Sequence, residues 1–337
     1  MKPISFCITN TVNPGNFRRM KQNRRKFIAT VAAASASIPM VSAFPADFLS
    51  QPAEKRYPIR IFSKALDTYD FGFICECALK SGIGGLDLTV RKGGKVEPAE
   101  VETKLPLLVE QAKKYNLTID LMVTDIVSVS DPLTERVLKT ASALGIKYYR
   151  FGYYEYDLKA GVWESLQKFR TGIKEVADLN EKYKIHGGYQ NHAGTRVGGP
   201  VWDLHELLSG LRPEFAGCQY DVRHAMVEGA SSWILGMRLI SPYIKTLAIK
   251  DFTWITGTGK PRAVTVPMGE GMVNWDLFFR TLKELNISGP MTIHIEYPLL
   301  EKGEENLPLQ QQQDIIVKKL NKDVDYINGY LAKYELK

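Results

Sequence analysis

Short apolar runs alternate with amphipathic stretches along the chain from residue 57 onward. The runs are rich in β-branched and aromatic residues, as strands are, and the stretches between them repeat apolar residues every three or four positions, as helices do. Strands are predicted at 59–63, 85–90, 117–123, 147–153, 184–191, 217–222, 244–252 and 291–297. The clearest helices are predicted at 100–115, 131–145, 163–183 and 273–286, with Asp131 and Asn274 as N-caps and Gly145 as a C-terminal cap.

Eight strands that alternate with helices over residues 58–332 predict one closed (β/α)8 barrel, the TIM barrel fold, as a single domain. The alternative is an open, doubly wound sheet, which we disfavour because no GxGxxG turn follows the first strand. The Gly-rich stretch 255–272 follows the seventh strand and is predicted to be a long loop that covers the mouth of the barrel.

Polar residues stand at the end of almost every predicted strand. They are Asp87 to Arg91, Asp125, Glu155, Gln190 to His192, Asp221 to His224, Lys250, Asp251 and Glu296. The carboxyl ends of barrel strands meet at one face of the barrel, where TIM-barrel enzymes have their active sites. The sequence therefore predicts a polar functional site at that face.

Residues 1–43 contain seven Lys and Arg and no acidic residue, and they are predicted to be an export signal. An Ala-rich apolar run follows the basic residues and ends in Val-Ser-Ala, a sequence that suits cleavage. Arg24–Arg25 resembles the pair of a twin-arginine signal, whereas Asn23 departs from that pattern. Met20 is the expected start and 44–57 the expected linker, with the mature protein in the periplasm or exported. The alternative is a disordered basic N-terminus of a cytoplasmic protein.

The rest of the chain is electrically neutral, with 37 Lys and Arg against 37 Asp and Glu. Nucleic-acid-binding proteins usually carry a basic face, so nucleic acid is not an expected partner. The apolar run of the signal is short and interrupted by Ser, which argues against a stable membrane span after processing. Cys75, Cys77 and Cys218 have no spacing typical of a disulfide framework or a zinc site, and we expect buried thiols.

Several motifs at these strand ends resemble the sugar phosphate isomerase/epimerase family, the xylose isomerase-like TIM barrels. The motifs are LDLTVR at 86–91, YQNH at 189–192, YDVRHA at 220–225, IKDF at 249–252, PMGEGMVNW at 267–275 and IHIEYP at 293–298. Their order along residues 58–330 carries the resemblance. It implies a TIM barrel that binds a small-molecule carbohydrate, and family members often associate into homo-oligomers.

The resemblance also implies one divalent metal ion, either Mn, Mg, Zn or Co. The best-characterised epimerases of the family bind it through Glu, Asp, His and Glu from strands 5 to 8, and the matching positions here are Gln190, Asp221, Ala248 and Glu296. Gln190 is a neutral amide and Ala248 has no donor atom, so two of the four positions depart from the pattern. Gln190, Asp221 and Glu296 are the predicted metal ligands, and a metal-free pocket is the alternative.

The chemistry that the resemblance implies is proton transfer beside a carbonyl, with two carboxylates acting from opposite faces. Glu296 is one predicted base, whereas Gln190 cannot accept a proton. We predict that Glu155, His294 or Lys250 replaces the second carboxylate. Alternation along the last strand puts His294 and Glu296 on one face, where the histidine can titrate near neutral pH.

Other side chains at the strand ends are predicted to bind the sugar. They are Asp87, Arg91, His192, His224, Asp251 and Trp254, with Tyr153 as a further aromatic surface for stacking. In the stretch GGYQNHAG, alternation sends Gln190 and His192 toward the ligand and Tyr189 and Asn191 to the other side. Asn191 is predicted to fix the following turn, and the two glycines allow close backbone packing.

The favoured hypothesis is an exported sugar or keto-sugar isomerase or epimerase that works by metal-assisted proton transfer at the mouth of the barrel. One alternative is a non-catalytic sugar-binding barrel, which the departures at Gln190 and Ala248 favour. Another is a related keto-sugar lyase or hydrolase. A DNA-repair endonuclease of the same fold needs a three-zinc cluster, and five His in a neutral body argue against it.

Overall fold

The computed structural model describes residues 56–257 and 259–336. The predicted export signal and most of the predicted linker lie outside the described residues. Parallel strands form a closed barrel in which the first strand pairs with the last. They are β1 (Ile59–Phe62), β2 (Gly85–Thr89), β3 (Thr118–Val123), β4 (Tyr148–Arg150), β5 (His186–Gln190), β6 (Ala216–Asp221), β7 (Ile244–Ile249) and β10 (Met291–Ile293). The predicted TIM barrel fold is therefore confirmed, with one barrel strand in each predicted range.

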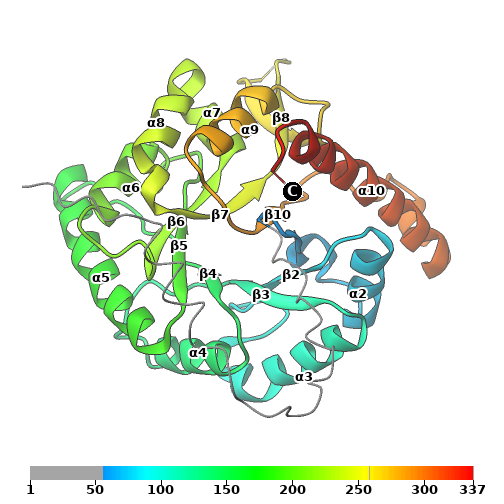
Figure 1. The fold of residues 1–337 in the computed structure, drawn as a ribbon, viewed down its shortest axis with the longest axis horizontal. Helices are drawn as coiled ribbons and strands as arrows, with labels where there is room; N and C mark the ends of the chain where they lie inside the picture. Colours follow the sequence, from blue (N-terminus) through cyan, green and yellow to red (C-terminus); the bar gives the residue numbers. More distant parts are fainter. Residues whose placement is uncertain (1–55, 258, 337) are drawn as a thin grey trace, which may run out of the picture. The chain divides into compact units, whose positions relative to one another are not determined.

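Helices form a ring around this barrel (Figure 1). They are α2 (Phe71–Lys80), α3 (Val101–Lys114), α4 (Pro132–Ala143), α5 (Val162–Tyr183), α6 (Val201–Leu208), α7 (Val222–Gly229), α8 (Trp233–Ile240), α9 (Trp275–Glu284) and α10 (Leu309–Lys333). Short 3-10 helices lie at Ser63–Leu66, Pro98–Glu100, Ala230–Ser232, Ser241–Tyr243 and Glu304–Asn306. None of the helices in the described part of the chain is long and apolar enough to cross a membrane.

The predicted caps are present at three helix ends. Asp131 and Asn274 accept hydrogen bonds from the backbone N–H groups of the first turns of α4 and α9. Gly145 directly follows Leu144, the C-cap residue of α4. It has a φ of 82°, a left-handed conformation that favours glycine. The cysteines at 75, 77 and 218 are free and buried, as expected.

A β-hairpin extends from the end of β7, formed by β8 (Asp251–Ile255) and β9 (Arg262–Val266). The prediction of a loop throughout 255–272 was wrong here, because residues 262–266 carry the β-rich sequence RAVTV and pair antiparallel with β8. The hairpin contacts the functional face of the barrel at two points. Arg223 donates a hydrogen bond to the Ala263 carbonyl (3.2 Å), and Thr265 Oγ1 lies 3.5 Å from Glu296 Oε2.

Candidate functional site

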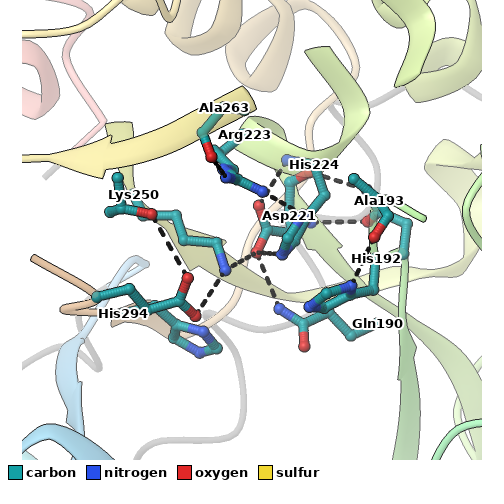
Figure 2. Close-up of polar contacts among 12 residues, drawn as sticks. Gln190, His192, Ala193, Asp221, Arg223, His224, Lys250, Ala263 and His294 are labelled. Atoms are coloured by element: carbon teal, nitrogen blue, oxygen red, sulfur yellow. Dashed lines mark hydrogen bonds and ion pairs between the residues drawn. The ribbon is translucent and has the colours of Figure 1, made fainter. Parts of the chain in front are cut away.

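A charged cluster lies at the carboxyl ends of the barrel strands, with Lys250 at its centre (Figure 2). Lys250 follows β7, and its Nζ lies 3.2 Å from Asp221 Oδ2, at the end of β6, and 3.0 Å from Glu296 Oε1, past the end of β10. The side chains of Lys250 and Asp221 are fully buried, whereas that of Glu296 is 35% exposed. The lysine therefore joins two carboxylates, of which Glu296 is the one that solvent reaches.

Gln190, at the end of β5, connects this cluster to β4. Its Oε1 accepts hydrogen bonds from Arg150 (3.1 Å) and from the Tyr153 hydroxyl (2.6 Å), and its Nε2 donates to Asp221 Oδ2 (2.9 Å). A guanidinium group can only donate, so Arg150 fixes the orientation of the amide. Gln190 faces the site as predicted, but it turns its amide nitrogen toward Asp221.

Asn191 holds the ends of β5 and β6 together. Its Nδ2 donates to the Asp221 carbonyl and its Oδ1 accepts from the Asp221 N–H, both at 2.8 Å. The prediction that Asn191 fixes the next turn was wrong, because its amide pairs with the backbone of the neighbouring strand. This pairing leaves the Asp221 carboxylate free to face Lys250.

His192 and His224 stack beside the cluster with ring centroids 3.9 Å apart. His224 Nδ1 faces Arg223 at 2.9 Å and must accept, so in the neutral ring Nε2 carries the proton, 3.7 Å from Asp221 Oδ2. His192 Nδ1 donates to the Ala193 carbonyl at 3.0 Å, which leaves Nε2 as an acceptor. Burial, and then the charge of Lys250, lower the pKa of both histidines. Both rings are therefore neutral at neutral pH, and His192 keeps a basic nitrogen.

His294 lies deeper in the barrel, against the Phe62 ring at 4.5 Å. Burial, and then the charge of Lys250, hold its pKa well below the usual range. The prediction that His294 titrates near neutral pH was therefore wrong. Its Nε2 lies 4.0 Å from Asp87 Oδ2. Burial raises the pKa of Asp87 to about 7, more than Arg150 lowers it, and neither carboxylate oxygen has a hydrogen-bond partner among the described residues.

Asp251 was predicted to bind the sugar, but its carboxylate binds the protein's own backbone instead. Its fully buried carboxylate accepts hydrogen bonds from the backbone N–H groups of Phe252, Gly269, Gly271 and Val273 and from the Trp275 indole. All of these partners except Phe252 follow the hairpin, so Asp251 fixes the path of the chain between β9 and α9. This carboxylate has no bond left for a sugar.

Two other predicted residues lie away from the cluster. The Glu155 side chain is 64% exposed and forms an ion pair with Arg196 at 2.7 Å. Trp254 is 42% exposed on β8 and contacts the Phe252 ring edge-on at 6.3 Å. Neither side chain contacts Lys250, Asp221 or Glu296, so the structure does not bring them into the site.

Arg91 lies closer to the cluster, because its guanidinium covers the Phe62 ring that packs on His294, with its Cζ 5.9 Å from the ring centroid. Arg150 and Arg223 are buried contacts of the site. Arg223 lies in the predicted polar run Asp221 to His224 but had no predicted role, whereas Arg150 was not predicted. One signal was available for Arg150, since it is a charged residue inside the otherwise apolar and aromatic strand KYYRFGY.

The residues do not fit the divalent metal that the resemblance implied. The ammonium group of Lys250 fills the position between the two carboxylates, and the Gln190 carbonyl faces Arg150. Ala248, at the strand 7 position, is a fully buried methyl group. Within residues 56–257 and 259–336, no group of three or more His, Cys, Asp or Glu is arranged to hold a metal. We therefore derive no chemical step through a metal.

Comparison with known proteins identifies the family. Residues 75–318 match the family described as xylose isomerase-like TIM barrel. The chain belongs to this family. No curated protein is significantly similar to it in sequence.

Solved structures of sugar epimerases are similar to this chain in fold. D-allulose 3-epimerase from Methylomonas sp. has a TM-score of 0.60 at 15% identity, over 82% of this chain and 99% of that one. D-psicose 3-epimerase from Clostridium cellulolyticum H10 has a TM-score of 0.60 at 11% identity, over 80% and 99%. An L-ribulose 3-epimerase has a TM-score of 0.61 at 11% identity, over 83% and 96%. At these identities the likeness shows the fold.

Proposed function

We propose that the protein is a sugar or keto-sugar isomerase that transfers a proton at a carbon beside a carbonyl. The observation that carries the proposal is the placement of Glu296. Lys250 holds one of its carboxylate oxygens, and the side chain is one-third exposed at the catalytic face of the barrel. Membership of the xylose isomerase-like family and the epimerases among its structural neighbours support the same chemistry.

The residues suit a transfer that uses one carboxylate base. Glu296 takes the proton from the carbon, the C–H electron pair forms the C=C bond of an enediol, and the carbonyl electron pair moves to oxygen. His192 Nε2 accepts the proton of the neighbouring hydroxyl and returns it to the other oxygen. Glu296 then gives its proton to the adjacent carbon on the same face, which isomerises the sugar. Epimerisation needs a second base on the opposite face, and Gln190 cannot supply it.

A non-catalytic sugar-binding barrel is the second candidate. The observation that favours it is that Lys250 pairs with both carboxylates of the cluster, Asp221 and Glu296, so each proton acceptor is already engaged by a cation. The two candidates differ in whether the bound sugar exchanges hydrogen with solvent.

The test is hydrogen exchange followed by NMR in D2O, with D-allulose, D-tagatose, D-fructose and L-ribulose as substrates. We expect deuterium beside the carbonyl and the appearance of an isomeric sugar. Glu296→Gln removes the base, and we expect it to lower the rate by about 10²- to 10⁴-fold. Glu175→Gln is the matched control, because Glu175 is exposed on α5. Sugar binding without any exchange would support the binding barrel and contradict the isomerase.

A further inference from the structure

We propose that the ammonium group of Lys250 takes the position of the divalent cation in this site, so that the protein works without a metal ion. The inference rests on the proposed function only for its consequence in catalysis. Its direct content is that Lys250, and not a metal ion, holds the carboxylates of Asp221 and Glu296 together.

Lys250 Nζ lies where a metal ion shared by Asp221 and Glu296 has to lie. Asp221 Oδ2 and Glu296 Oε1 lie 3.2 and 3.0 Å from Lys250 Nζ. A metal ion that both oxygens bind lies about 2.0–2.6 Å from each of them, depending on the ion, and this places it in the volume that Nζ occupies. Metal binding therefore requires the buried lysine to leave. Figure 2 shows the Lys250 side chain extending toward Asp221.

The other oxygen atoms that could bind a metal ion already accept hydrogen bonds. Asp221 Oδ1 accepts from the His224 N–H (3.0 Å), and Oδ2 accepts from Gln190 Nε2 (2.9 Å) as well as facing Lys250. The Gln190 carbonyl, the neutral oxygen that suits a hard cation, accepts from Arg150 and Tyr153 instead. These hydrogen bonds use the lone pairs of the oxygens. No set of oxygen lone pairs is left pointing at one common position, as the ligands of a metal ion do.

The charges of the site also disfavour an added metal ion. Two carboxylates, of Asp221 and Glu296, share this region with three cationic side chains, of Lys250, Arg150 and Arg223. The cations are all buried, Arg150 and Arg223 at less than 10% exposure. A divalent ion added to this set gives a large positive excess in a region of low dielectric constant, where repulsion between like charges is strong. These five side chains already carry one positive charge in excess with the lysine in place, and a divalent ion beside the lysine raises the excess to three.

Strand β7 and the residue after it direct a methyl group and then a lysine toward the site. Ala248 pairs in register with Asp221, and its methyl group is fully buried. Lys250 stands two residues later, and side chains two apart on a strand point to the same face. The position of the family's metal-binding histidine is therefore taken by an alanine. The lysine two residues later is long enough for its ammonium group to reach both carboxylates.

The experiment measures metal binding directly. The purified protein is analysed for Mn, Mg, Zn and Co, treated with EDTA, and titrated with Mn²⁺ by calorimetry, together with Lys250→Ala and Lys174→Ala. Lys174 pairs with the exposed Asp178 and is the matched control. We expect no stoichiometric metal in the wild type or the control, and no shift of Tm with EDTA. Lys250→Ala frees two carboxylates, and we expect it to bind Mn²⁺ about 10- to 100-fold more tightly than the wild type.

One metal ion per wild-type chain, lost with EDTA together with a fall in Tm, would overturn the proposal. A folded Lys250→Ala protein that binds Mn²⁺ no better than the wild type would overturn it as well. If Lys250→Ala does not fold, the wild-type measurement still decides. The result is independent of sugar turnover, so a failure of the proposed isomerase activity is seen separately in the NMR experiment.

Discussion

At the scale of single residues, Asp87 is a buried acid whose pKa is raised inside the barrel. Its side chain is fully buried, and neither carboxylate oxygen has a hydrogen-bond partner in the described part of the chain. Burial raises its pKa to about 7, far above the usual value of about 3.9 for aspartate. An ionised carboxylate in this position lowers the free energy of unfolding. Residues with strongly shifted pKa values are common at functional sites.

This shift predicts a pH-dependent effect of Asp87→Asn. The folded protein binds more protons than the unfolded chain between about pH 4 and 7, so the contribution of Asp87 to stability is lost as the pH rises through that range. We expect Asp87→Asn to be more stable than the wild type at pH 8 by about 2–4 kcal/mol, and by much less at pH 5. Urea unfolding at both pH values measures the difference.

Asp178→Asn is the control, because Asp178 is exposed and pairs with Lys174. An effect of Asp87→Asn that is equal at pH 5 and pH 8 would contradict the assignment of a raised pKa.

The sequence predicted which strand ends meet at the site, but not how every side chain there is oriented. Gln190, Asp221, Lys250 and Glu296 were predicted from their places at strand ends, and the structure brings them together. Asp251 stands in the same motif as Lys250, but adjacent residues on a strand point to opposite sides, and its carboxylate is used by the backbone beyond β9. The orientation of the Gln190 amide depends on Arg150, which is distant in sequence, so no local pattern could predict it.

At the scale of elements, the β8–β9 hairpin and the segment after it depend on the buried carboxylate of Asp251. Four backbone N–H groups and one indole N–H donate to it. Asp251→Ala leaves these donors without partners, and we expect it to lower the free energy of unfolding by about 3–4 kcal/mol. Urea unfolding measures the loss.

The matched substitution is Asp178→Ala on the surface of α5, for which we expect a change within about 0.5 kcal/mol. Equal effects of the two substitutions would show that Asp251 has no structural role. The hairpin was not predicted because the glycines of 255–272 favour a loop. Gly257 and Gly259 instead lie between two β-rich segments that pair with each other.

Strand β5 shows a prediction that the structure confirms at this scale. The glycine pair in GGYQNHAG was expected to allow close packing. A Cβ atom on Gly187 lies 2.6 Å from the Phe151 ring and 2.7 Å from the Tyr149 hydroxyl, closer than real contacts. Tyr149 of β4 and Phe151, just after it, therefore occupy the space that a side chain at Gly187 needs.

At the scale of the whole molecule, the barrel was predictable because its signal is local and repeated. Each strand carries its own apolar run, each helix its own periodicity and caps, and closure follows from the number of units. The charge balance of the site was not predictable in this way. It depends on Lys250, Arg150 and Arg223 meeting Asp221 and Glu296 from four different strands, which only the assembled barrel brings about.

The measurement that tests the central claim most directly is deuterium exchange into a ketose by protein freed of metal with EDTA. We expect the wild type to incorporate deuterium beside the carbonyl at the same rate with and without EDTA, and Glu296→Gln to lose this activity. Exchange that stops with EDTA and returns with Mn²⁺ would contradict the metal-free site. A complete absence of exchange with every ketose that binds would contradict the assignment of Glu296 as a base.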